Sequence, residues 1–154
     1  MMTSLSCDVI KALRGRTLVT AESCTGGGIG AALTAVPGSS TVYKGGIISY
    51  TNSVKHCLLQ VSQSTLDQYG AVSAQVASQM AVGARKVLDA DIAVSVTGLA
   101  GPDGDDRGTP VGTVFIGYCH KDCVETRRYL FTGDREAVRQ QAIDAALQLV
   151  LEMK

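Results

Sequence analysis

The sequence lacks any long apolar run, and this absence excludes the simplest membrane proteins. None of its hydrophobic stretches approaches the roughly 20 consecutive apolar residues that a helix needs to cross a bilayer. Residues 1–7 also have neither the basic region nor the apolar core of a secretory signal. We therefore expect a cytoplasmic protein with no membrane partner.

An excess of charge of either sign is also missing. The 14 basic and 14 acidic side chains cancel, which removes the simplest electrostatic argument for a nucleic-acid partner. Charged residues make up 18% of the chain and hydrophobic residues 45%, a balance that argues against disorder. At 154 residues the chain has the size of one domain with a substantial core. We expect that domain to span residues 1–154.

Histidine and regularly spaced cysteine are scarce, which weakens the case for two kinds of site. Only His56 and His120 are available as imidazole bases, so a Ser-His-Asp triad has little support. The five cysteines are odd in number and scattered, a pattern typical of reduced thiols. Cys119 and Cys123 lie near His120, but no second pair with zinc-finger spacing follows. We expect no zinc site here.

Three aspartates in a glycine-rich loop raise the alternative of a calcium site. Counted from Asp103 as the first position of an EF-hand loop, the fifth position is Arg107 and the twelfth is Val114. Neither side chain offers the oxygen ligand that those positions require. We expect Asp103, Asp105 and Asp106 to lie in a solvated, flexible loop.

The order of helical and extended patterns predicts an α/β domain. Val76, Met80 and Ala84 recur at helical spacing after Ser73, which is a good N-cap, and Asp134 caps a second amphipathic helix. The nearly continuous apolar run 92–96 is typical of a strand covered on both faces. The expected strands are 17–20, 42–50, 92–96, 111–118 and 123–131, and the other expected helices are 4–13, 25–35 and one from Asn52 or Ser53 to about Leu59.

This order predicts one three-layer α/β/α sandwich. Helices precede and follow most strands, so they should cover both faces of the sheet. The short polar connection at 120–122 makes the strands on either side of it an antiparallel pair. We therefore expect a mixed, mostly parallel sheet.

The stretch TAESCTGGG, residues 20–28, offers two nucleophiles, Ser23 and Cys24. A strand, a sharp turn and a helix form the usual setting for a serine nucleophile or a phosphate-binding loop. The stretch is nevertheless neither a G-x-S-x-G elbow nor a Walker loop with its lysine. By itself it leaves three interpretations open: catalysis, anion binding, or a glycine-rich turn with Ser23 as a helix cap.

A lysine that could activate a serine lies in a second segment, SYTNSVKHC. Lys55 falls in the first turn of the helix that follows Tyr50, where a positive charge opposes the helix macrodipole. That position lowers a lysine pKa, particularly with desolvation, and a neutral amine can deprotonate a serine hydroxyl. Adjacent helical residues point about 100° apart, so His56 and Lys55 should not serve one site. The alternative is a lysine that extends to solvent.

Two further segments carry groups that could bind a ligand. Thr97 and Gly98 lie where the buried strand ends, which is the usual ligand-binding edge of an α/β sheet. Arg135 and Arg139 are spaced i,i+4 on the opening turns of the last helix, where the macrodipole disfavours cations. A phosphate or carboxylate ligand would relieve this conflict, as would an acidic neighbour on the same helix.

The motifs TAESCTGG, SYTNSVK, GAVS, TGLAGPDG, PVGTV and GDREAVR occur in this order at single-domain spacing. With them the chain resembles the CinA C-terminal domain family, the nicotinamide-nucleotide amidohydrolases, from about Thr17 onward. The resemblance implies a three-layer α/β/α enzyme that hydrolyses the carboxamide of nicotinamide mononucleotide to nicotinate mononucleotide and ammonia. It implies neither a metal nor an organic cofactor.

The resemblance also implies a role for particular residues. Carried over by position, Ser23 would be the nucleophile, Lys55 its general base, and Tyr50 a partner in proton transfer or orientation. We expect main-chain N–H groups at the glycine-rich helix start to bind the oxyanion. The substrate-binding residues expected from the resemblance and from the strand end are Thr25, Gly26, Gly27, Thr97, Gly98 and Arg139.

Two other functions are compatible with these residues. One is a nucleotide-binding or competence-associated regulatory module without turnover, suggested by the name traditionally attached to the family. The other is an enzyme that uses Cys24, because a thiolate at a helix N-terminus is activated. In each case the expected partner is a small-molecule nucleotide. An exposed edge strand would favour a homo-oligomer.

Overall fold

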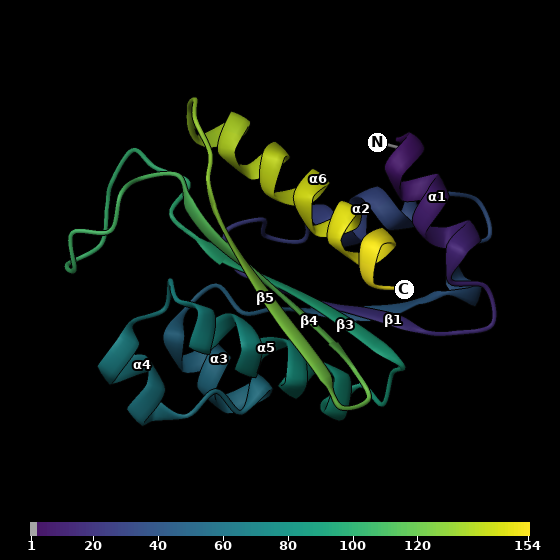
Figure 1. Ribbon diagram of the computed structural model, residues 1–154, viewed down its shortest axis with the longest axis horizontal. Coiled ribbons are helices and arrows are strands. Elements are labelled where there is room, and N and C mark those ends of the chain that lie inside the picture. The colour runs from purple at the N-terminus through teal and green to yellow at the C-terminus, as the bar shows by residue number, and fades with distance from the viewer. Residues whose placement is uncertain (1–2) are drawn as a thin grey trace.

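The computed structural model describes residues 3–154 and has one sheet between two layers of helices (Figure 1). Met1 and Met2, which begin the segment tested above for a secretory signal, lie outside the described residues. The predicted three-layer α/β/α sandwich is confirmed. Its elements are α1 (Ser4–Ala12), β1 (Leu18–Glu22), α2 (Gly28–Thr34), a 3₁₀ turn (Ser39–Thr41), β2 (Tyr43–Ile48), α3 (Asn52–Leu59), α4 (Gln63–Tyr69), α5 (Ala74–Val87), β3 (Ile92–Gly98), β4 (Thr113–His120), β5 (Cys123–Leu130) and α6 (Arg135–Met153).

The sheet has the strand order β2-β1-β3-β4-β5. β1 pairs in parallel with β2 and with β3, whereas β4 is antiparallel to β3 and to β5. Four of the five strands therefore run in one direction and β4 alone runs in the other, which confirms the mixed, mostly parallel prediction. The carboxyl ends of β1, β2 and β3 consequently meet at one edge of the sheet.

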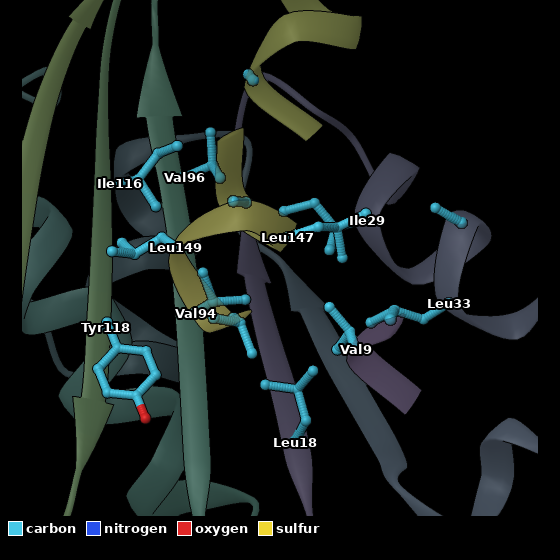
Figure 2. Close-up of a cluster of buried hydrophobic side chains, with 14 of the residues drawn as sticks. Val9, Leu18, Ile29, Leu33, Val94, Val96, Ile116, Tyr118, Leu147 and Leu149 are labelled. Carbon is cyan, nitrogen blue, oxygen red and sulfur yellow. The ribbon is translucent and has the colours of Figure 1, made fainter. Parts of the chain in front are cut away.

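A hydrophobic core lies on each face of the sheet because strand side chains alternate. Along β3, Ile92, Val94 and Val96 enter the core beneath α1, α2 and α6, whereas Ala93 enters the core against α5. Figure 2 shows the first core, where Leu147 and Leu149 of α6 lie over the strand side chains. All of these side chains are fully buried.

Small residues let α5 approach the other face closely. The Ser95 hydroxyl donates a 2.6 Å hydrogen bond to the carbonyl oxygen of Ala77. A Cβ at Gly117 would lie 2.5 Å from that same oxygen, so any larger residue there would push α5 off the sheet. Nearby, the Thr97 hydroxyl donates to the carbonyl oxygen of Ala71 (2.8 Å), which places the chain that enters α5 beside the end of β3.

The structure differs from the sequence-based expectation most at three places, and the ends of several other elements, such as β2, β3 and β4, differ from the expected ones by one or two residues. α4 was not predicted; Ser62 caps it and Leu66 is its one buried residue. The N-cap of α3 is Thr51 rather than Asn52 or Ser53. β1 is longer than expected and α2 begins only at Gly28, so residues 23–27 form a loop.

β2 and β5 form the two outer edges of the sheet within the described chain. Such edges can pair with a second copy, but a homo-oligomer stays a prediction. Within residues 3–154, no helix combines the length and the apolar character that crossing a membrane requires.

Candidate active site

Glu22, whose role the sequence did not reveal, organises the loop that carries Ser23. Its carboxylate is almost fully buried and accepts hydrogen bonds from the hydroxyls of Thr20 (3.2 Å) and Thr25 (2.8 Å). It also accepts from the main-chain N–H groups of Ile29 (2.9 Å) and Gly30 (3.0 Å). A carboxylate is favoured there because α2 begins with unpaired N–H groups. Glu22 therefore ties the end of β1 to the start of α2 and bends residues 23–27 between them.

Replacing Glu22 by glutamine should destabilise the fold. The amide keeps the shape of the carboxylate but adds two donors where four donors already converge, so buried groups lose their partners. We expect the free energy of unfolding to fall by about 1–3 kcal/mol, measured by urea denaturation. Glu152→Gln, on the exposed surface pair with Arg127, is the matched control and should change it by less than about 1 kcal/mol. Equal stability of Glu22→Gln and wild type would contradict this role.

Ser23 and Lys55 lie in contact at the edge where β1, β2 and β3 end. Ser23 follows β1, and its N–H donates to the carbonyl oxygen of Val96 on β3 (3.0 Å). Lys55 extends from α3, and its Nζ lies 3.0 Å from Ser23 Oγ. The carbonyl oxygens of Ser49 (2.9 Å) and Tyr50 (3.5 Å) also accept from Nζ. These acceptors come directly after β2, so the three strand ends together aim the amine at the hydroxyl.

Burial changes the protonation of Lys55. The side chain is 1% exposed, and desolvation lowers its pKa from the ordinary 10.5 to about 8, although the neighbouring Cys24 opposes the shift. A neutral fraction is therefore present near neutral pH. In that form Nζ can accept the proton of Ser23, which is the reaction a general base performs.

Cys24, the alternative nucleophile, has the opposite tendency. Burial raises the pKa of its thiol from 9.0 to about 11, although Arg139, Lys55 and Arg135 each lower it in part. A thiol with this pKa is almost entirely protonated at neutral pH, and the thiolate is the nucleophilic form. The activation expected for a cysteine at a helix N-terminus is therefore absent, whereas the Ser23 hydroxyl lies beside an amine that can take its proton. Which of the two side chains is the nucleophile stays a prediction.

Only some N–H groups of the glycine-rich helix start are occupied, so the expectation that they bind an oxyanion stays a prediction. Gly26 donates to the carbonyl oxygen of Ser23 and Gly28 to that of Thr25. Gly26 and Gly27 have φ values of +57° and +100°, which suit glycine and make the tight turn. Within residues 3–154 the N–H groups of Thr25 and Gly27 have no acceptor, and the N–H of Cys24 has none on another residue. The N–H of Cys24 belongs to the residue directly after Ser23.

A cleft of about 680 Å³ opens beside Ser23 and Lys55. Its volume lies within the roughly 300–1,000 Å³ that is usual for small-molecule sites. The end of β3, the start of α3, residues 70–72 and the loop 99–112 line it. That loop projects at the left of Figure 1. Arg107 fastens it to the end of α4 through the carbonyl oxygens of Asp67 (2.6 Å) and Gln68 (3.0 Å).

The acidic part of this loop is ordered by its own contacts. Asp105 accepts hydrogen bonds from the N–H groups of Arg107 and Thr109, both at 3.0 Å. Across the part of the chain that the structure describes, no group of three or more His, Cys, Asp or Glu side chains is arranged to hold a metal ion. Asp103, Asp105 and Asp106 of this loop line the cleft.

Tyr50 contacts Lys55 through its main-chain carbonyl oxygen and Arg135 through its phenol. The side chain is 58% exposed and lines the cleft. Its hydroxyl accepts a 3.0 Å hydrogen bond from Nη2 of Arg135, whose Nη1 donates to the carbonyl oxygen of Gly101 (2.7 Å). A part for the phenol in proton transfer stays a prediction.

The predicted substrate-binding residues fall into two groups. Thr97 and Gly98 line the cleft, and the Thr97 hydroxyl donates to the carbonyl oxygen of Ala71 (2.8 Å). The others do not line the cleft: three of them belong to the loop 23–27, and Arg139 donates to the carbonyl oxygens of Cys24 (3.0 Å) and Thr25 (3.1 Å) in that loop. Substrate contacts by these residues stay predictions. The residues of this second group are Thr25, Gly26, Gly27 and Arg139.

The family model for the CinA C-terminal domain matches residues 2–154. The chain belongs to this family. Among curated relatives, the nicotinamide-nucleotide amidohydrolase PncC of Enterobacter agglomerans is 51% identical over 150 residues, covering 96% of this chain and 92% of the relative. A structure of a CinA superfamily protein from Escherichia coli is 38% identical with a TM-score of 0.95, covering 97% of this chain and 88% of that one.

The CinA domain also occurs within longer relatives. A putative competence-damage inducible protein of Clostridium novyi is 47% identical over 132 residues, which cover 86% of this chain but 32% of the relative. The chain thus spans nearly the whole of a PncC protein and about a third of this longer one.

Proposed function

We propose that this CinA-family protein is a nicotinamide-nucleotide amidohydrolase that converts nicotinamide mononucleotide and water to nicotinate mononucleotide and ammonia. The observation that carries the proposal is the 3.0 Å contact between Lys55 Nζ and Ser23 Oγ at the floor of a nucleotide-sized cleft. The 51% identity to a protein named for this activity, over nearly the full length of both chains, supports the substrate.

The proposed reaction begins with the neutral form of Lys55. Nζ takes the proton of Ser23 as Oγ forms a bond to the carboxamide carbon. The C–N bond then breaks, and the proton held by Lys55 passes to the leaving nitrogen, which departs as ammonia. Water attacks the resulting ester with Lys55 again as the base, the bond from carbon to Ser23 breaks, and the proton returns to Ser23.

Charge on the carboxamide oxygen needs a fixed donor while both intermediates form. The N–H of Cys24 is our candidate because the residue after a nucleophile supplies this donor in related strand–turn–helix sites. One such donor is worth about 10²–10³ in rate. Arg139 supports it from behind, since its bonds to the carbonyl oxygens of Cys24 and Thr25 hold that part of the loop.

The proposal predicts that the purified protein releases ammonia from nicotinamide mononucleotide. Ammonia and nicotinate mononucleotide should form in equal amounts, measured by a coupled ammonia assay and by chromatography. Chelators should leave the rate unchanged, because every group in the proposed reaction is a side chain or main-chain group of this chain. Tight binding of the nucleotide without turnover would instead favour the regulatory module.

A further inference from the structure

We propose that Arg135 binds the phosphate of the nucleotide substrate, at the end of the cleft away from Ser23. This inference rests on the proposed function, because it names the part of that substrate that one residue recognises. The helix-dipole argument offered both Arg135 and Arg139 as anion ligands and the family resemblance favoured Arg139, but their contacts in the structure point to Arg135.

Arg135 is held in place and keeps donors to spare. Its guanidinium lines the cleft, where Nη1 donates to the Gly101 carbonyl oxygen and Nη2 to the Tyr50 hydroxyl. A guanidinium has five N–H donors in a planar fork, and that fork matches the oxygens of phosphate. Two contacts fix the plane of the group. Within residues 3–154 its remaining donors have no partner, so they are free to bind a ligand.

The other cations near the cleft are committed to the protein. Lys55 contacts Ser23, Ser49 and Tyr50 at the floor of the cleft. The guanidinium of Arg107 caps the last carbonyl oxygens of α4. Arg139 is bound to the back of the nucleophile loop and does not line the cleft.

The acidic groups of the cleft confine an anion to the same place. The carboxylates in the lining belong to α4 and to the loop 99–112, on the wall that Arg107 fastens. A dianionic phosphate would be repelled from these carboxylates, whereas Gly101, at the start of the same loop, contributes a carbonyl oxygen that Arg135 itself binds. Arg135 is the first residue of α6, where the positive end of the macrodipole adds to the attraction, although the carboxylates of Asp134 and Glu136 offset part of it. The acidic residues in the lining are Asp67, Asp103, Asp105 and Asp106.

Tyr50 sets the separation between the reacting group and the phosphate. Its carbonyl oxygen accepts from Lys55 and its hydroxyl accepts from Arg135, so most of a tyrosine lies between the two cations. In nicotinamide mononucleotide, the carboxamide and the phosphate are at opposite ends, with a pyridine ring and a ribose between them. A substrate with its carboxamide on Ser23 would therefore direct its phosphate toward Arg135.

The test compares nicotinamide mononucleotide with nicotinamide riboside, which lacks the phosphate. Arg135→Gln should raise KM for the mononucleotide about 10- to 100-fold, the loss expected for charged hydrogen bonds, with a much smaller change in kcat. It should leave kcat/KM for the riboside within about threefold. Arg135→Lys should fall between, because lysine keeps the charge without the fork. Arg14→Gln, an exposed arginine beyond α1, is the matched control and should match wild type on both substrates.

The outcomes separate this inference from the proposed function. A wild-type protein that hydrolyses neither substrate refutes the proposed function, and calorimetry of mononucleotide binding to wild type and Arg135→Gln then still tests the phosphate contact. Equal loss on both substrates would overturn the inference and assign Arg135 to the shape of the site. Unchanged mononucleotide KM in Arg135→Gln would also overturn it.

Discussion

Ser23→Ala should reduce kcat for ammonia release from nicotinamide mononucleotide by about 10⁴-fold or more, the size of loss seen when a nucleophile is removed. Without Oγ no ester can form, and the remaining groups of the cleft only bind and polarise the amide. Lys55 keeps its contacts with the carbonyl oxygens of Ser49 and Tyr50. The fold should therefore tolerate the change, and mononucleotide binding by calorimetry should stay within about threefold of wild type.

Cys24→Ala is the matched control for this result. It removes the neighbouring side chain, which has the raised pKa, but keeps the main-chain N–H that we assign to the oxyanion. We expect kcat within about fivefold of wild type, since no bond to sulfur forms in the proposed reaction. An active Ser23→Ala together with an inactive Cys24→Ala would assign the nucleophile to the cysteine and contradict our proposal.

Lys55→Met should reduce kcat by about 10²–10⁴-fold, the contribution typical of a general base. Methionine nearly matches the length of lysine and suits the buried site, but its sulfur does not take up the proton of Ser23. In wild type the rate should rise with pH and level off above about 8, where Lys55 becomes neutral. The methionine variant should lack this dependence. A pH-independent wild-type rate between pH 6 and 9 would count against lysine as the base.

The same group gives a readout that needs no activity. The pKa of Lys55 is about 8 in the folded protein against an ordinary 10.5. Between these values the unfolded chain still binds a proton that the folded protein has released, so the free energy of unfolding should increase with pH across this window. Below about pH 8 the lysine is protonated in both states and the dependence ends. Urea denaturation at pH 7.5 and 9 should show this increase in wild type and lose it in Lys55→Met, and this interval stays below the pH range where the raised pKa of Cys24 has the opposite effect.

Elements with a strong repeating pattern were predictable from the sequence. The helix of α5 begins after Ser73 and that of α6 after Asp134, as expected, because a capping side chain and a long apolar stripe coincide there. α4 was missed because it has seven residues and a single buried side chain, too little for a periodic pattern. It packs on α5, and its last carbonyl oxygens accept hydrogen bonds from Arg107. Its stability therefore depends on neighbours distant in sequence.

The residues of the site also divide into those that the sequence could predict and those that it could not. Ser23 and Lys55 could be chosen because each residue type, at a strand end or a helix start, has its own chemistry. Glu22 could not, because its N–H donors belong to a helix that begins at Gly28, six residues later, and a carboxylate in a strand carries no local signal of burial. One signal was available in retrospect: a charged residue ending an apolar strand, directly before a glycine-rich helix start without an acidic cap.

The sequence by itself determined the class of fold and the family, and it singled out Ser23 and Lys55 as candidates for amide hydrolysis, since these depend on local patterns and residue chemistry. Only the tertiary structure decided how those side chains behave. Burial lowered the pKa of Lys55 and raised that of Cys24, and both shifts depend on segments packed from across the sheet. Packing also separated two arginines four residues apart: Arg139 turned behind the nucleophile loop, and Arg135 turned into the cleft. The desolvation of a side chain and the direction in which it points are properties of the folded chain, because neighbours distant in sequence create them.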